Sequence, residues 1–440
     1  MITRYNQLQG YYIPSIFLLQ VLNGDGELKD MGKWTTQQKS TFLHEYIHFL
    51  QDITTVIGLH NIYTHGEVLR YISELMRNGQ NTFTLPLDPA MAGKNVGNNW
   101  KAGQETVGDS DTKAISVNGY SVNLGMNLVD DLTGNVTPVS KVEINCIDER
   151  GNRVIVRLGS SHMMECMAKA IQESVYPTGM RTSPYNPYYI AEDLANIIIP
   201  GLAGKKQTLI ALYDRALQSS NPGYSFVRYL EEMAKLGYDS NTLTPAIVYQ
   251  GMKAAVTNSS SIGITPFSDS FKQLSQLALG VLKEMTGGIW FLSNLDRWAE
   301  STLNNGVTMR LKYPELFLEL AKGGDIIIND IFQTFLKVFG TPLVLNSKHK
   351  CDFLRPANVM ISKSEIVDVM SMMQIIYVFT YGAPYPCLMK WYCVKNSSFI
   401  NRLHVNKRCD DRPWMKTTRF GNCKFCRWWR FKGFKDLHLL

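Results

Sequence analysis

The chain has 440 residues, a formal net charge of +7, 45% hydrophobic residues and 19% charged residues, which is a globular composition and not that of a disordered or fibrous protein. It is long enough to bury a large core, and we expect two or three domains. The most apolar later stretch, residues 369–381, is too short to span a bilayer, and no signal peptide is recognisable. We therefore expect a cytoplasmic protein without a membrane partner, whose eight cysteines are thiols or metal ligands.

Residues 11–22 predict the first element, a β-strand. The segment YYIPSIFLLQVL is rich in β-forming residues. The turn sequence NGDG at residues 23–26 follows it and closes the strand. We therefore expect a single strand that ends at about residue 22.

Residues 35–58 predict a buried helix. Thr35 and Gln38 have the spacing of a capping box, and Gly58 is a typical helix end. Apolar side chains occur all around this segment: Phe42, Leu43, Tyr46, Ile47, Phe49, Leu50, Ile53, Val56 and Ile57. A helix that is apolar on every side is buried in a protein core.

The same segment contains the pattern H-E-x-x-H at residues 44–48. Positions i and i+4 of a helix share one face, so His44 and His48 can bind one zinc ion. Glu45 lies beside them, where it can act on a water molecule. Burying two histidines and a glutamate is costly unless they have a partner, and a metal ion is the obvious partner. The alternative is that both histidines are hydrogen-bonded core residues.

Residues 60–158 predict a second helix, a loop and a β insertion. The helix covers residues 60–77, and the Gly- and Asn-rich loop covers residues 78–113. Apolar and polar residues alternate over residues 114–158, and the last two alternating runs flank the turn sequence DERGN at residues 148–152. This pattern indicates a hairpin. We therefore expect a small antiparallel β insertion at about residues 114–158.

A helix is predicted directly after this insertion. Residues 159–173 have helical periodicity, with Ser160 or Ser161 as the cap, and the helix carries Glu165. A Pro-rich loop with three tyrosines follows at residues 177–189. The loop separates this helix from the rest of the chain.

The second half of the chain predicts an α-helical domain and a basic tail. The pattern is helical from residue 190 to about residue 346 and again over residues 364–381. Residues 401–440 contain eleven Lys and Arg against three Asp, so the excess positive charge of the chain belongs to its tail.

Five of the eight cysteines lie in the last 54 residues, 387–440. Cys423 and Cys426 form a C-x-x-C pair. Together with Cys409 and either Cys393 or His404, they would complete a four-ligand structural zinc site. The alternative is a C-x-x-C pair without metal, or a redox-sensitive thiol pair.

Aromatic residues are interleaved with the basic residues of the tail. They are Trp414, Phe420, Phe425, Trp428, Trp429, Phe431 and Phe434. Such a mixture is typical of surfaces that bind nucleic acid. The aromatic residues could equally cover a small zinc module or contact an acidic partner protein.

The segment HEYIHFLQD at residues 44–52 resembles the zincin metallopeptidases, in particular a poorly described intracellular group. The metzincin extension would place a third histidine at position 54, which is Thr54 here. The resemblance therefore implies a gluzincin-like arrangement, in which a glutamate from a later helix is the third zinc ligand. It also implies that the strand before the helix is its neighbour, with an edge that can hold an extended peptide.

Three acidic residues are candidates for a role at this zinc ion. Glu165 lies among small residues, as does the ligand-bearing helix of the gluzincins, and it is the preferred third ligand. Glu67 lies 19 residues after His48, a spacing similar to that of gluzincins, and it remains an alternative, as does His162. Asp52 fits better as an acceptor for a histidine N–H.

The resemblance also implies a peptidase mechanism. Glu45 would be the general base towards a water molecule that the zinc ion activates, and would then deliver the proton to the leaving amine. A tyrosine or histidine from a later segment would stabilise the oxyanion. Tyr185, Tyr188 and Tyr189 are candidates by position.

Together, these features predict an α+β protein with a zincin-like metallopeptidase domain at residues 1–189, an α-helical domain at residues 190–385 and a Cys-rich tail at residues 386–440. The predicted function is zinc-dependent cleavage of a specific intracellular protein. One alternative is a non-catalytic protein that binds nucleic acid or a partner through residues 401–440. Another is a zinc hydrolase of a non-peptide amide.

Overall fold

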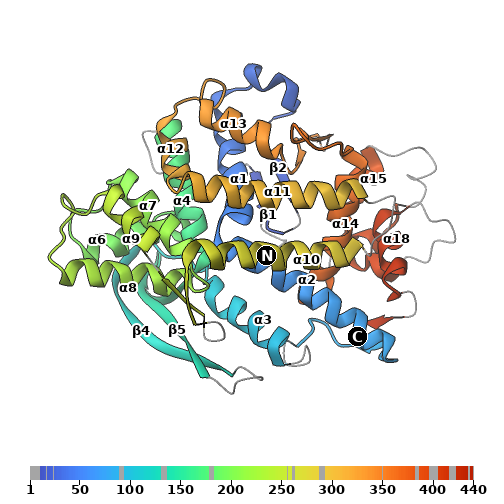
Figure 1. Cartoon of the computed structure of the whole chain (residues 1–440), viewed down its shortest axis with the longest axis horizontal. Coiled ribbons are helices and arrows are strands. Elements are labelled where there is room, and N and C mark those ends of the chain that lie inside the picture. Colours follow the sequence, from blue (N-terminus) through green and yellow to red (C-terminus); the bar gives the residue numbers. More distant parts are fainter. Residues whose placement is uncertain are drawn as a thin grey trace.

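The computed structural model (Figure 1) describes residues 10–439 except residues 16, 23, 89–93, 130–135, 178–182, 255, 260–262, 287–292, 349, 382–385, 396–404, 416–422 and 435–436. Helices dominate, and the strands form small sheets, which confirms the α+β class. The helices are α1 (Thr36–Thr54), α2 (Val56–Arg77), α3 (Lys94–Val107), α4 (Ser160–Val175), α5 (Tyr185–Tyr188), α6 (Ile190–Ile198), α7 (Lys206–Leu217), α8 (Pro222–Lys235), α9 (Pro245–Ala254), α10 (Phe267–Thr286), α11 (Ser293–Lys312), α12 (Leu316–Lys322), α13 (Asp330–Phe339), α14 (Lys363–Tyr381), α15 (Lys390–Lys395), α17 (Arg408–Asp411) and α18 (Lys424–Phe431). The strands are β1 (Gly10–Ile13), β2 (Leu18–Val21), β3 (Thr82–Phe83), β4 (Ser116–Val129), β5 (Val136–Ile147), β6 (Arg153–Leu158), β7 (Val256–Ser259), β8 (Gly263–Pro266), β9 (Leu343–Leu345), β10 (Cys351–Asp352) and β11 (His438–Leu439).

The N-terminal residues contribute two strands to a sheet of order β1-β2-β9-β10, with β1 at one edge. β1 and β2 form an antiparallel hairpin, so the prediction of a single strand over residues 11–22 is wrong. Pro14 follows β1 and has no backbone N–H with which to continue the ladder. Ser15 and Phe17 adopt a φ of 58° in the reversal, which is uncommon for residues other than glycine.

The pairing of β2 with β9 is parallel and joins the first residues of the chain to residues 343–345. This pairing crosses the boundary predicted at residue 189. One core cluster also contains buried side chains from both ends of the described chain, from Tyr12 to Phe434. The division into three domains stays a prediction.

The helix predicted over residues 35–58 is present, but it ends earlier. Thr35 and Gln38 form the predicted capping box, in which each side chain accepts a hydrogen bond from the other residue's N–H. Gly58 does not end α1, because it lies in the first turn of α2. A Cβ at Gly58 would lie 2.4 Å from the carbonyl oxygen of Gln51, so this glycine permits α1 and α2 to cross closely.

The predicted β insertion is confirmed. β4, β5 and β6 form an antiparallel sheet, and the predicted turn at residues 148–152 joins β5 to β6. The loop predicted over residues 78–113 is wrong in part, because α3 occupies much of it. Trp100 in α3 is buried, and such burial can outweigh the weak helix propensity of the neighbouring Gly and Asn residues.

α1 lies at the centre of the molecule, in contact with α4 and with the long helix α11 (Figure 1). A fully buried ion pair lies at the C-terminal end of α1. The guanidinium of Arg310 in α11 contacts the carboxylate of Asp214 in α7 at 2.8 Å. Its Nε donates a hydrogen bond to the carbonyl of Thr54, the last residue of α1. The end of α1 is therefore bound to α11, which the ion pair joins to α7.

The tail packs on the rest of the molecule through α18, which lies against α14. Lys424 and Arg427 both form ion pairs with Asp368 of α14. Four of the tail's aromatic residues are buried, namely Phe425, Trp428, Trp429 and Phe434. These rings form core contacts and are not available to stack on bases.

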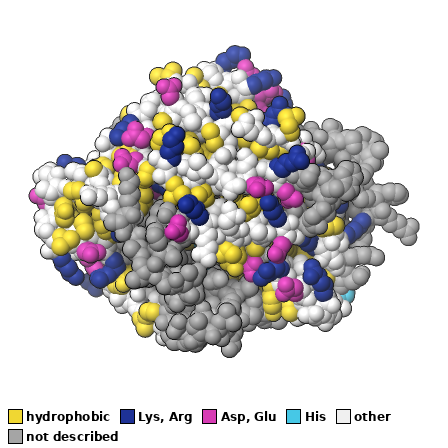
Figure 2. Space-filling model, viewed as in Figure 1, with side chains coloured by type: hydrophobic (Ala, Val, Ile, Leu, Met, Phe, Trp, Pro, Cys, Tyr) yellow, Lys and Arg dark blue, Asp and Glu magenta, His cyan; other side chains and the backbone are white. Residues whose placement is uncertain are grey.

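The described surface is mixed in charge. Figure 2 shows Lys and Arg interspersed with Asp and Glu over the described part of one face. None of the described helices combines the length and the apolar character that crossing a membrane requires.

Candidate metal centre

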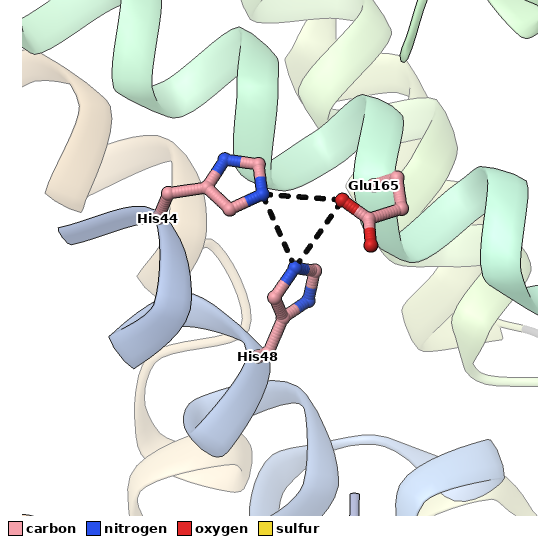
Figure 3. Close-up of side chains that lie close together, drawn as sticks. All are labelled: His44, His48 and Glu165. Atoms are coloured by element: carbon pink, nitrogen blue, oxygen red, sulfur yellow. Dashed lines mark hydrogen bonds and ion pairs between the residues drawn. The ribbon is translucent and has the colours of Figure 1, made fainter. Parts of the chain in front are cut away.

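Two adjacent helices bring three ligand-type side chains together. His44 and His48 lie one turn apart on α1, and Glu165 lies on α4, which packs against α1. The Nε2 atoms of the two histidines are 3.3 Å apart. Oε2 of Glu165 lies 3.1 Å from the first and 3.4 Å from the second. Figure 3 shows the three side chains pointing toward a common centre.

These distances fit a single tetrahedral ion. Nitrogen and oxygen donors placed about 2.0–2.1 Å from such an ion lie about 3.3–3.4 Å from one another. The three donor pairs of the cluster are close to this separation. Within the described part of the chain, this is the one group of three or more His, Cys, Asp or Glu donors that lie within 4.8 Å of one another. The cluster could therefore hold a metal ion.

In the absence of metal, the pKa values of His44, His48 and Glu165 are shifted in different directions. Burial lowers the pKa of His44. Burial opposes protonation of His48 too, but the carboxylate of Glu165 outweighs it and raises the pKa of His48 to about 9. Burial would raise the pKa of Glu165, but the two histidines outweigh it and hold that pKa far below its usual range. The metal-free cluster therefore carries a proton on His48 at neutral pH.

Glu45 follows His44 on α1 and lies next to this cluster, with its side chain against β1. It is 7% exposed, and burial raises its pKa to about 8. The backbone N–H of Tyr12 in β1 donates a hydrogen bond to the carboxylate of Glu45, which lowers the pKa of Glu45 and so opposes the effect of burial. The strand passes so close that a Cβ at Gly10 would lie 3.1 Å from Cγ of Glu45 and 2.6 Å from Cγ2 of Thr41. Gly10 thus lets the edge strand approach Glu45.

The acceptor for the second histidine is Gln51, and sequence reasoning favoured Asp52 instead. Nδ1 of His48 donates to Oε1 of Gln51 over 2.7 Å. Asp52 points the other way and accepts hydrogen bonds from the hydroxyl of Tyr12 and the N–H of Ser15. The signal for Gln51 was present in the sequence, because it lies three residues after His48 and shares its helix face.

Glu165 is the candidate third ligand that lies beside the two histidines. Glu67 lies on α2, where its carboxylate pairs with Arg70 at 2.6 Å. His162 lies one turn before Glu165 and is fully buried. Its Nδ1 accepts a hydrogen bond from the N–H of Gly159, the residue that caps α4, where Ser160 or Ser161 was expected.

Of the three candidate tyrosines, Tyr188 is next to the cluster. Its ring centroid lies 5.9 Å from that of His44. The charge of Glu165, followed by burial and the charge of Glu45, raises the pKa of Tyr188 well above its usual value. Tyr185 and Tyr189 donate their hydroxyl hydrogens elsewhere, to Asp193 and Glu173. Tyr188 therefore presents a neutral phenol near both carboxylates.

The side chain of Glu165 is 28% exposed, and that of His44 is 8% exposed. A cavity of about 310 Å³ lies apart from it, lined in part by Glu27, Trp34, Asn346 and Lys350. None of the three candidate ligands lines that cavity. Glu165 is thus the most exposed of the three candidate ligands.

The four cysteines that are candidate zinc ligands lie in short helices or at their ends. Cys393 is in α15, Cys409 in α17 and Cys426 in α18, and Cys423 caps α18. No three of their sulfurs meet the 4.8 Å separation found for the His-His-Glu cluster, as far as the described residues show. His404 lies outside the described residues. A structural zinc site in the tail stays a prediction.

No protein-family model matches the chain, and neither does any curated protein or solved structure. Function can therefore be inferred only from the donor atoms of the cluster and their geometry.

Proposed function

We propose that this chain is a zinc-dependent endopeptidase that hydrolyses peptide bonds of a specific protein substrate. The observation that supports the proposal best is the convergence of His44, His48 and Glu165 beside the buried carboxylate of Glu45. Two imidazoles and one carboxylate form a donor set that suits zinc and leaves a coordination position open for catalysis. The same set is what the resemblance to the gluzincins implies.

Glu45 is the proposed general base and general acid. A zinc ion in this site supplies Lewis acidity, which lowers the pKa of water and polarises a carbonyl group. Glu45 accepts a proton from the attacking water and then donates it to the nitrogen of the leaving amine. Burial raises the pKa of Glu45 to about 8 in the metal-free site, so its carboxyl group holds a proton there, and a cation bound beside it would favour the ionised form that a general base requires.

Tyr188 is the proposed electrophile for the oxyanion. Its phenol stays neutral because its pKa lies well above the usual value, so it can donate a hydrogen bond to a carbonyl oxygen that becomes negative. Its ring lies beside His44, at the same site as Glu45. Hydrogen-bond donors fixed before the reaction stabilise such charge at little reorganisation cost.

The edge strand β1 is the proposed support for the substrate. Among the described residues, β1 is the outermost strand of its sheet, and Gly10 and Tyr12 lie against Glu45. An extended peptide that pairs with this edge would place a scissile bond beside the general base. Strand addition uses backbone hydrogen bonds for affinity and side-chain pockets for specificity.

The variant Glu45→Gln tests this proposal. It removes the base but keeps all three candidate ligands, so we expect zinc content to be unchanged and peptide cleavage to fall by about 10²–10⁴-fold. Wild type and variant would be incubated with a proteome-derived peptide library, with cleavage products identified by mass spectrometry and zinc measured in the same samples. Equal cleavage by the two proteins would overturn the proposal.

A further inference from the structure

Gln51 occupies a special position between the two helices of the metal centre. Its side chain is fully buried on α1. Oε1 lies 2.7 Å from Nδ1 of His48, and Nε2 donates to the carbonyl oxygen of Met164 over 3.0 Å. Met164 is the residue directly before Glu165 on α4. One amide thus contacts a candidate ligand on one helix and the backbone beside a candidate ligand on the other.

These two contacts fix the orientation of the amide and the protonation of the imidazole. A carbonyl oxygen only accepts hydrogen bonds, so the amide group that faces Met164 must be the NH₂. The amide oxygen then faces His48, and an oxygen only accepts, so Nδ1 of His48 must carry the hydrogen. The nitrogen that remains for a metal is Nε2, which is the atom that faces Glu165.

We infer that Gln51 is the positioning residue of the metal centre, selecting Nε2 of His48 as the ligand atom and holding α1 and α4 at the separation that brings His48 to Glu165. The inference rests on the proposed metal site. No equivalent partner fixes His44, whose Nδ1 is buried without a hydrogen-bond partner among the described residues. The pre-organisation of the centre therefore depends on Gln51, and we expect it to act on metal affinity. Outer hydrogen-bond partners of histidine ligands typically contribute 10–100-fold to metal affinity.

Asp52 provides a matched control. It is also fully buried on α1, directly after Gln51, but it accepts hydrogen bonds from Tyr12 in β1 and from Ser15 in the turn that follows. Asp52→Asn keeps an oxygen acceptor there and leaves the contacts of His48 intact. A general loss of stability of this helix would affect both positions, whereas the inferred role belongs to Gln51 alone.

The experiment measures zinc affinity by competition with a chromogenic chelator for wild type, Gln51→Met, Gln51→Glu and Asp52→Asn. Gln51→Met has a similar length without hydrogen bonds, and we expect its affinity to fall by about 10–100-fold. Gln51→Glu keeps the acceptor for Nδ1 but loses the donor to Met164, so we expect it to recover part of that loss. Asp52→Asn should bind zinc within about threefold of wild type. Circular dichroism confirms that each variant is folded. If Gln51→Met does not fold, the zinc affinity of Gln51→Glu is compared with that of wild type instead.

A second readout follows the imidazole itself. Long-range ¹H–¹⁵N correlation spectra of the zinc-loaded protein report which ring nitrogen of His48 carries hydrogen. We expect Nδ1–H in wild type and a changed Nδ1 resonance in Gln51→Met. Wild-type affinity and an unchanged resonance in folded Gln51→Met would overturn the inference. Tight zinc binding without any peptide cleavage would defeat the proposed peptidase function and leave the role of Gln51 intact.

Discussion

His48 shows how one residue links proton binding to metal binding. Its pKa is raised to about 9 by the carboxylate of Glu165, so the metal-free protein holds a proton there at neutral pH. A metal ligand must be an unprotonated nitrogen, and binding therefore releases that proton. Glu45, whose pKa is raised to about 8 by burial, is a second group beside the site that can lose a proton when a cation arrives.

We expect zinc affinity to increase as the pH is raised from 7 towards 9, because fewer protons then have to be displaced. Above the pKa of His48 the affinity should level off. The proton count at pH 7 can be measured by isothermal titration calorimetry in buffers of different ionisation enthalpy. Glu45→Gln removes the second titrating group and should release about one proton. Binding enthalpies that do not depend on the buffer, with constant affinity from pH 7 to 9, would contradict this prediction.

Local spacing identifies some site residues, whereas Glu165 was predicted only through the resemblance to the gluzincins. His44, Glu45 and His48 can be found from local spacing, because helix periodicity alone puts both histidines on one face. Glu165 is 121 residues from His44, so its approach depends on the packing of α4 on α1. Tyr188 differs from Tyr185 and Tyr189 only in where the chain turns, which no local pattern encodes.

At the scale of elements, the crossing of α1 and α2 shapes the metal centre. The two helices are separated only by Thr55, whose side chain accepts from the N–H of Gly58 and donates to the carbonyl of Gln51. Gly58 approaches that same carbonyl. The backbone of Gln51 is thus packed against α2, while its side chain holds His48.

We expect Gly58→Ala to lower the free energy of unfolding by about 1–3 kcal/mol, the usual cost of an extra methyl group in a packed core. The new Cβ would lie 2.4 Å from a backbone oxygen, which cannot move as a flexible side chain can. Gly103→Ala in α3 is the control, because nothing lies within 4 Å of its Cβ. It should be neutral or stabilising by up to about 1 kcal/mol. Urea denaturation measures both, and equal stability of the two variants would contradict the account.

The elements with a strong local signal were predictable. The capping box of α1, the hairpin at residues 148–152 and the helix with Glu165 all follow from patterns within one segment. The hairpin of β1 and β2 was missed because a continuous apolar run conceals a reversal at Pro14. α3 was missed because Gly and Asn are weak helix formers, and only the burial of Trp100 reveals its stabilisation.

At the scale of the whole molecule, one buried ion pair connects distant parts of the chain. Arg310 and Asp214 are both fully buried. Arg310 also donates hydrogen bonds to the carbonyl oxygens of Thr54, at the end of α1, and of Pro314. Asp214 accepts further hydrogen bonds from Gln218 and Tyr249. This network could not be predicted from sequence, because its members come from four separated segments and their spacing follows no periodicity.

We expect Arg310→Met to lower the free energy of unfolding by about 3–5 kcal/mol, because it leaves the charge of Asp214 buried without a counterion. Arg228→Met is the control. Arg228 pairs with Glu231 on the surface, where such a pair contributes at most about 1 kcal/mol. Urea denaturation followed by circular dichroism compares the two. A loss below about 1 kcal/mol for Arg310→Met would show that the network is not a main source of stability.

The central claim is that α1 and α4 together hold a zinc ion through His44, His48 and Glu165. Inductively coupled plasma mass spectrometry of purified wild type, Glu165→Ala and Glu67→Ala tests it most directly. We predict that Glu165→Ala loses about one zinc ion per chain relative to wild type, whereas Glu67→Ala, which removes the competing candidate, retains it. A Glu165→Ala protein that keeps the full zinc content of wild type would contradict the claim.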